Sequence, residues 1–177
     1  MREIKVGTSM IRIIKGDITK QTTDAIVNAA NTRLAPGGGV AGAIHGAAGP
    51  KLWEECKSLH GCHTGEAKIT NGYDLKSKHV IHTVGPVYSG SKQDEAQLAS
   101  CYKNSLNLAA KYNLKSISFP AISTGIFGYP LKEAARVALK TTRIWLQTHE
   151  PGLLIQFVLY DDNALTVFEQ TFDDVIS

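Results

Sequence analysis

Short apolar segments rich in β-branched residues recur along the chain and are separated by polar or glycine-containing stretches. Runs of this length and composition are typical of buried strands rather than helices. The residues before the first of them are compatible with an additional edge strand. The segments predicted as strands are Ile11–Ile14, Ala25–Val27, Ala67–Thr70, Val80–Val84, Ser116–Pro120 and Leu154–Tyr160.

The intervening segments place apolar residues at helical spacing. We predict helices over Val40–Ala48, Lys51–Leu59, Gln93–Tyr112, Leu131–Gln147 and Ala164–Phe172. Alternating strands and helices predict one α/β domain over residues 1–177, with a mixed, largely parallel central sheet and helices on both of its faces. In such sheets, ligands bind in the loops beyond the carboxyl ends of the strands.

The amino-acid composition and charge exclude some classes of function. The 177 residues are 43% hydrophobic and 20% charged, as in ordinary globular proteins. The net charge is +3 with no basic block, so we expect no nucleic-acid partner, whereas a small anionic ligand is compatible. No apolar run approaches the ~20 residues of a membrane helix. The three cysteines and the lack of an apolar segment after Met1 predict a cytoplasmic protein, and nothing in the pattern requires more than a monomer.

Four potential metal ligands lie close together at Cys56, His60, Cys62 and His63. Zinc sites normally use paired Cys-x-x-Cys ligands, and this spacing lacks them. We therefore expect no metal site here and no metal or redox cofactor for the protein.

A first glycine-rich loop follows the predicted strand Ala25–Val27. Asn28 and Asn31 precede Gly37, Gly38 and Gly39, which lead into a helix of small residues. Glycine lets backbone N–H groups approach a ligand closely, and a helix N-terminus favours anions. The segment predicts a phosphate-bearing ligand beside two carboxamides.

A second loop has the same character. Residues 121–129 (Ala-Ile-Ser-Thr-Gly-Ile-Phe-Gly-Tyr) lie between the strand Ser116–Pro120 and Pro130, which suits the first turn of the next helix. Phe127 stands between two glycines, where its ring can cover a sugar. Two loops of this kind can hold the two halves of a pyrophosphate.

The first loop also matches the pattern G-x-G-x-x-G of dinucleotide-binding dehydrogenases, through Gly37, Gly39 and Gly42. That fingerprint requires a strand that feeds directly into the first glycine and an acidic residue at the end of a second strand. Eight residues separate Asn28 from Gly37, and the candidate acids Glu54 and Glu55 lie in a predicted helix. These mismatches argue against hydride transfer.

Taken together, these motifs resemble the macrodomain family, and most closely its MacroD-type branch. The resemblance covers nearly the whole chain and is carried by Gly16–Lys20, Ala25–Asn31, the triple-glycine loop, Cys62–Ala67, His79–Pro86 and Phe119–Gly125. It implies a three-layer α/β/α fold that binds ADP-ribose. It also implies hydrolysis of ADP-ribosyl esters on acidic side chains and deacetylation of O-acetyl-ADP-ribose, with mono-ADP-ribosylated proteins as partners.

The resemblance also implies residue roles. Asp17 would accept a hydrogen bond from the adenine amino group, with the Ile18 backbone beside it. The carboxylate of Asp17 suits a helix cap equally well. Tyr160 would flank the adenine ring, although such a tyrosine is more commonly part of the core. Asn31 would hold the distal ribose, whereas Asn28 would bind the backbone of its own loop. The residues expected around the diphosphate and riboses are Gly38, Gly39, Val40, Ser123, Thr124, Gly125, Ile126 and Phe127.

This chain departs from the MacroD-type pattern at Ala41, where that branch usually has aspartate. Residues 41 and 45 share a helix face, so an aspartate there would orient His45 or accept a proton from water. His45 alone is a candidate for binding phosphate or water, or is structural. Hydrolysis would then rely on the phosphate of the substrate to position water, as the family resemblance implies for members with alanine at this place.

Three alternatives follow from Ala41, and a fourth follows from the adenine pocket. The chain is a hydrolase, or a non-catalytic module that reads ADP-ribose, or a hydrolase in which alanine was introduced to trap a ligand. A poly-adenylate-binding protein would use the same adenine pocket, but its binding would depend strongly on salt.

Overall fold

The computed structural model describes residues 1–176, which form one mixed sheet of seven strands in the order β1-β2-β7-β6-β3-β5-β4. The two edge strands, β1 and β4, are antiparallel to their neighbours, and the other pairings are parallel. The predicted mixed, largely parallel sheet is confirmed. The strands are β1 (Arg2–Val6), β2 (Ser9–Lys15), β3 (Ala25–Ala29), β4 (Ala67–Asn71), β5 (His79–Thr83), β6 (Ser116–Phe119) and β7 (Leu154–Leu159).

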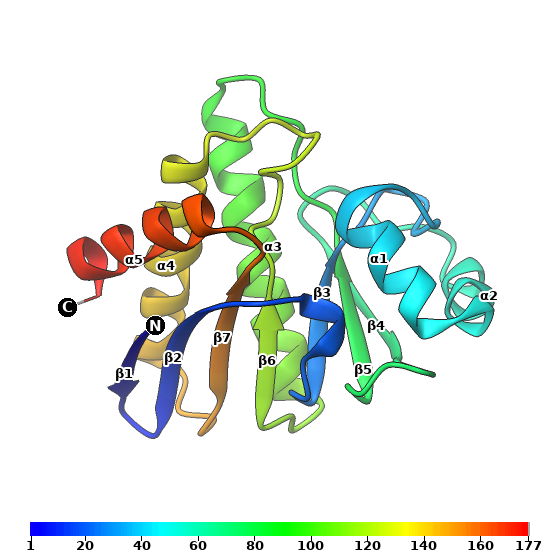
Figure 1. Cartoon of the computed structure of the whole chain (residues 1–177), viewed down its shortest axis with the longest axis horizontal. Coiled ribbons are helices and arrows are strands. Elements are labelled where there is room, and N and C mark those ends of the chain that lie inside the picture. The colour runs from blue at the N-terminus through cyan, green and yellow to red at the C-terminus, as the bar shows by residue number, and fades with distance from the viewer. Residues whose placement is uncertain (177) are drawn as a thin grey trace.

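Five α-helices and one 3₁₀ turn complete the fold, and they cover both faces of the sheet (Figure 1). They are η1 (Ile18–Lys20), α1 (Gly39–Ala48), α2 (Pro50–Ser58), α3 (Lys92–Lys111), α4 (Leu131–Thr148) and α5 (Asp162–Val175). Each predicted strand and helix is present with shifted ends, and the additional edge strand before Ile11 is β1. Tyr160 lies just beyond β7 rather than at its end. None of the helices within residues 1–176 is long and apolar enough to cross a membrane.

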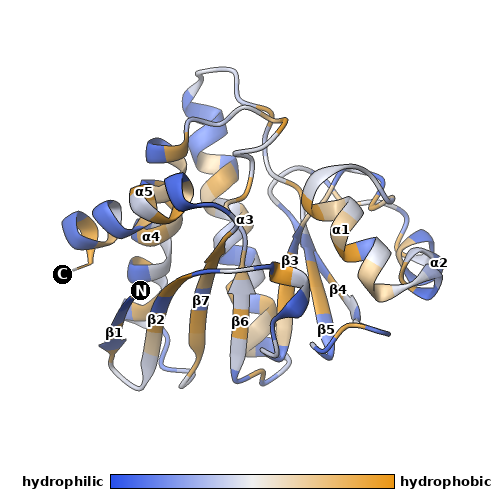
Figure 2. Ribbon diagram, viewed as in Figure 1, coloured by the Kyte–Doolittle hydropathy of each residue, from blue (hydrophilic) through white to orange (hydrophobic). Residues whose placement is uncertain are grey.

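The core is divided by the sheet into two apolar layers. Successive residues of β3 alternate between them: Ala25 and Val27 pack with α3, α4 and α5, whereas Ile26 packs with α1 and α2. This alternation is the period of a strand that is buried on both faces. Figure 2 shows the central strands as largely hydrophobic ribbons, while polar residues lie on the outer surfaces of the helices.

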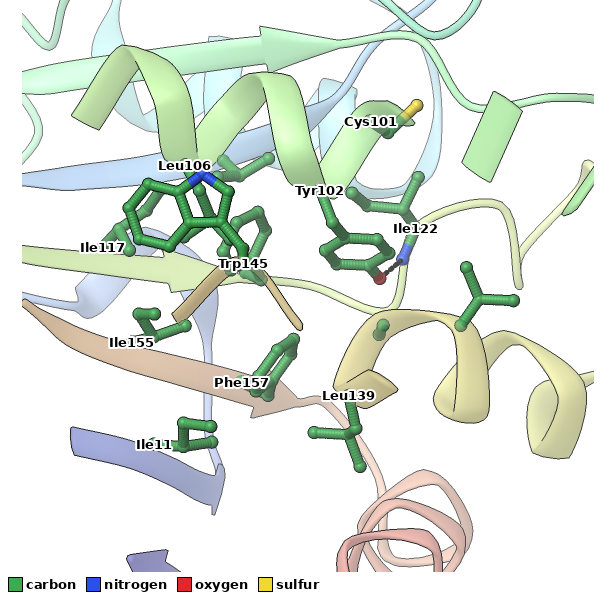
Figure 3. Close-up of a cluster of buried hydrophobic side chains, with 14 of the residues drawn as sticks. Ile11, Cys101, Tyr102, Leu106, Ile117, Ile122, Leu139, Trp145, Ile155 and Phe157 are labelled. Atoms are coloured by element: carbon green, nitrogen blue, oxygen red, sulfur yellow. Dashed lines mark hydrogen bonds between the residues drawn. The ribbon is translucent and has the colours of Figure 1, made fainter. Parts of the chain in front are cut away.

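The larger core layer also fixes the start of the second glycine-rich loop. Tyr102 of α3 is fully buried against Phe119 and Phe157. Its hydroxyl accepts a 3.3 Å hydrogen bond from the Ile122 N–H and lies 3.5 Å from the Pro120 carbonyl (Figure 3). A buried backbone N–H without a partner is costly. The Tyr102 hydroxyl supplies that partner for Ile122 and thereby fixes the position at which the loop leaves β6.

We expect Tyr102→Phe to lower the free energy of unfolding by about 1–3 kcal/mol, because it leaves the Ile122 N–H without a partner inside the protein. Urea denaturation followed by circular dichroism measures the change. Tyr112→Phe is the matched control, since Tyr112 is 48% exposed. Equal effects of the two substitutions would contradict this role of the phenol.

Candidate functional site

The two glycine-rich loops line one cavity of about 280 Å³ beyond the carboxyl ends of β3 and β6. Figure 1 shows these loops at the same edge of the sheet, from which α1 and α5 also begin. Among the residues predicted to bind the ligand, this cavity is lined by Asn31, Gly38, Gly39, Val40, Ser123, Gly125, Ile126 and Phe127. Ala41 also lines it and is 6% exposed. No ionisable side chain lines this cavity within residues 1–176.

A second cavity of about 580 Å³ continues from the first. The two share Gly39, Val40, Ala121 and Gly125, so together they form one cleft across the edge of the sheet. The predicted residues at its far end are Asp17, Ile18, Thr124 and Tyr160. A cleft of this length suits a ligand with two ends of different chemistry and a linker between them.

The N-terminus of α1 faces the junction of the two cavities. Its N-cap residue is Gly38, which makes no side-chain hydrogen bond to the helix. The first N–H groups of a helix lack intrahelical partners, and here no side chain occupies them. Gly42 allows this geometry, because a Cβ at that position would collide with the Gly37 carbonyl. The first loop therefore presents backbone donors and a helix dipole to an anion.

The second loop is held in a strained conformation. Ser123 has φ +67° and is only 6% exposed, and its hydroxyl has no hydrogen-bond partner within residues 1–176. The Tyr129 N–H bonds to the Ser123 carbonyl at 2.9 Å, and the Tyr88 N–H bonds to the Phe127 carbonyl at 2.8 Å. A left-handed backbone at a non-glycine residue is costly and tends to occur at binding sites.

Asp17 caps the 3₁₀ turn, as one of its two expected roles requires. Its Oδ1 accepts hydrogen bonds from the Thr19 N–H at 2.9 Å and the Thr19 hydroxyl at 2.7 Å. These bonds lower the pKa of the carboxyl group, so it is ionised at neutral pH. Its second oxygen remains available to a donor from a ligand. Tyr160, which its type alone would place in the core, is instead 82% exposed at the rim of the second cavity.

The role expected of Asn28 is filled by Asn31. Asn31, not Asn28, binds the backbone of its loop: Asn31 Oδ1 accepts from the N–H groups of Arg33 and Ala35, and Nδ2 donates to the Ala35 carbonyl. Asn28 is fully buried, and its Nδ2 lies 3.1 Å from His82 Nδ1. The prediction for Asn28 is wrong, because the side chain of Asn28 in β3 points into the layer between the sheet and α1 rather than into the loop.

His82 lies at the centre of a buried hydrogen-bond network in this layer, and the sequence analysis did not predict that network. Because the Asn28 amide group donates to Nδ1, the ring carries its proton on Nε2 and donates it to Thr70 Oγ1 at 2.9 Å. The Cys56 thiol lies 3.8 Å from the same nitrogen. A histidine in the middle of the apolar strand Val80–Val84 was the available signal, since such a residue needs buried partners.

His45 joins this buried layer and does not line either cavity. It is 7% exposed, with its ring centroid 6.5 Å from that of Trp53 and 6.4 Å from that of His82. Neither ring nitrogen has a hydrogen-bond partner within residues 1–176, and burial lowers the pKa of the imidazole. The structure therefore does not place His45 where a catalytic group would touch the ligand, and Ala41 separates it from the cavity by one helical turn.

The four potential metal ligands do not converge. Cys56 and Cys62 are buried, and burial raises the pKa of each thiol to about 11, whereas His60 and His63 are exposed. Within residues 1–176, no group of three or more histidine, cysteine or acidic side chains is arranged to hold a metal ion.

Fold and site together define an α/β domain with an anion-binding cleft at the carboxyl edge of its sheet. The family model of the macro domain matches residues 27–138, and the chain belongs to this family. A macro domain-containing protein of Chlorobaculum tepidum is 54% identical over 162 residues, which cover 91% of this chain and 94% of that protein. The ADP-ribose glycohydrolase MACROD1 of Rattus norvegicus is 56% identical over 142 residues, which cover 79% of this chain and 55% of the rat protein.

Two solved macrodomain structures also match this chain over most of its length. The Oceanobacillus iheyensis macrodomain with ADP superposes with a TM-score of 0.95 at 42% identity, over 99% of this chain and 96% of that one. The Trypanosoma brucei macrodomain in complex with ADP-ribose gives a TM-score of 0.86 at 45% identity, over 90% of this chain and 68% of that one.

The buried histidine layer predicts a dependence of stability on pH. Burial, together with the neighbouring His45, lowers the pKa of His82 from 6.5 to about 3. Between pH 3 and pH 6.5, His82 is therefore protonated in the unfolded chain and neutral in the folded protein. The free energy of unfolding falls as the pH decreases from 6.5 toward 3. The expected slope is about 1.4 kcal/mol per pH unit for this group.

Urea denaturation at several pH values between these limits checks the slope. His82→Gln is expected to flatten it by about one proton, whatever its effect on stability at neutral pH. His63→Gln, at an exposed position, serves as the control. A slope that is the same in His82→Gln as in the unmodified protein would exclude His82 as its source.

Proposed function

We propose that this chain binds ADP-ribose along the cleft and hydrolyses ADP-ribosyl esters on acidic side chains, O-acetyl-ADP-ribose, or both. The observation that carries the proposal is the continuity of the cleft from the uncapped N-terminus of α1 to the free carboxylate oxygen of Asp17. The relatives with ADP or ADP-ribose in their structures, and the relative named as an ADP-ribose glycohydrolase, support it.

The charge distribution sets the direction of the ligand. The diphosphate lies against the N-terminus of α1 and the loop Ser123–Phe127, where backbone donors and the helix dipole favour an anion. The adenine lies beside Asp17, whose second oxygen accepts from the exocyclic amino group, and Tyr160 covers one face of the ring. The distal ribose, which carries the scissile ester, then occupies the first cavity near Asn31.

The chemistry in the first cavity proceeds without an acid or base from the protein. Water attacks the ester carbonyl or the anomeric carbon, and the substrate's own phosphate positions it. The bond from that carbon to the ester oxygen breaks, ADP-ribose and the free carboxylate leave, and the proton released from water passes to the solvent. The loops contribute by holding the substrate in a reactive geometry and by stabilising developing negative charge through backbone N–H groups. A general base is worth about 10²–10⁴ in rate, so the reaction is slower than in an enzyme that supplies one.

A reader module that binds ADP-ribosylated proteins without hydrolysing them is the second candidate. Ala41 favours it, because this residue puts a methyl group on the cavity wall where a proton acceptor would otherwise lie. A poly-adenylate-binding function gains no support, since the cleft offers one anion-binding end rather than a continuous basic track.

Isothermal calorimetry with ADP-ribose, followed by a timed assay on a mono-ADP-ribosylated glutamate peptide, tests the proposal. We expect micromolar binding and slow release of ADP-ribose. Binding without release over hours would select the reader module, and no binding would refute both candidates. AMP is the control ligand, since it lacks the distal half that the first cavity holds.

We expect Ala41→Asp to raise turnover by about 10²–10⁴ while weakening ADP-ribose binding by no more than about tenfold, since the added carboxylate lies in the cavity that holds the diphosphate. Residue 41 occupies the first turn of α1, where a carboxylate is favourable by about 0.3–1 kcal/mol. It lies one turn before His45, whose ring nitrogens have no hydrogen-bond partner in the described part of the chain. Single-turnover kinetics measure the rate. Ala41→Asn is the matched control without charge, and an equal gain from it would contradict a role for the carboxylate.

A further inference from the structure

The adenosine end of the cleft is less favourable to an anion than the diphosphate end. Helix α5 begins there, but Asp161 already caps it, because its Oδ1 accepts the Ala164 N–H at 2.8 Å. The nearby cation, Lys15, is held by Asp162 at 2.8 Å. Asp161 and Asp17 both line the second cavity, so the groups that face the nucleoside are carboxylates.

The two ends of the cleft therefore differ in what they accept. At α1 the N-cap is Gly38, which leaves the helix N–H groups and the helix dipole open to a phosphate. At α5 the carboxylate of Asp161 accepts the Ala164 N–H, and its negative charge offsets the positive end of the helix dipole. One helix N-terminus attracts an anion, and the other repels a second one.

Building on the proposed function, we infer that the cleft accepts ADP-ribose only when its adenosine carries no further phosphate, and that Asp161 is a residue that determines this specificity. With adenine beside Asp17 and the diphosphate at α1, the adenosine ribose passes the end of β7 and the start of α5. A phosphate on that ribose would approach Asp161. The substrate class is then ADP-ribose with an unphosphorylated adenosine ribose, and 2′-phosphorylated ADP-ribose is rejected.

The expected size of the effect follows from Coulomb's law. A phosphate dianion that approaches a carboxylate through a water-like medium at low ionic strength loses roughly tenfold in affinity. The loss shrinks at high salt, because exposed charges are screened over about 3–10 Å. A purely steric exclusion would not respond to salt in this way.

Calorimetry on the full chain tests the inference with two probes, ADP-ribose and ADP-ribose 2′-phosphate, at ionic strengths of about 0.02 M and about 0.5 M. The key variant is Asp161→Asn, which removes the charge while asparagine still caps a helix as well as aspartate does. The control is Asp74→Asn, at an exposed position in the turn between β4 and β5, which connects the strand ends at the opposite edge of the sheet. The quantity compared is the ratio of the two dissociation constants.

We expect ADP-ribose to bind about tenfold more tightly than its 2′-phosphate at low salt, with the ratio falling at high salt and falling to about threefold in Asp161→Asn. The ratio stays unchanged in Asp74→Asn. A ratio near one in the unmodified protein overturns the inference, as does a ratio that neither salt nor Asp161→Asn alters, and both results leave the proposed function intact. Failure of ADP-ribose itself to bind overturns the proposed function.

Discussion

The site depends on the parallel pairing of β3 with β6 at the centre of the sheet. Ala25 pairs with Ile117 and Ile26 with Ser118, so the two strands end side by side and release their loops at the same edge. These loops are more than eighty residues apart in sequence, and neither alone encloses a cavity. The register is fixed because residues on each face of β3 are buried in a different core layer, and a slip by one residue would exchange those layers.

Much of this architecture could be predicted from the sequence, because the information is periodic. Apolar runs such as Val80–Val84 and the amphipathic segment that became α3 define the layers without any atomic detail. The glycine-rich segments also identified the edge of the sheet at which the ligand binds, since helix N-termini and loops after parallel strands have few alternative uses.

The individual hydrogen bonds could not be predicted in this way. Asn28 and Asn31 are the same residue type three positions apart, yet one faces the buried layer and the other binds its loop. The outcome depends on where β3 ends and on the presence of His82, which comes from a distant strand. Likewise, helical spacing places His45 on the face of Ala41, but only the packing of α2 buries its ring beside Trp53. The hydrogen-bond partner of a polar side chain depends on residues distant in sequence, and the periodicity of apolar residues does not predict it.

Under the proposed function, binding and catalysis in the first cavity rest on different groups. Its anion-binding groups are backbone N–H groups of two loops, held by Gly42 against Gly37 and by the phenol of Tyr102 beneath Ile122. Backbone N–H groups are present whatever side chain stands at position 41. Under the proposed function, a change of that side chain acts on the reaction of the bound ligand, while the backbone donors that hold the diphosphate remain. Exchange of alanine and aspartate at this one helical position is then enough to separate a slow hydrolase from a faster one, with the same fold.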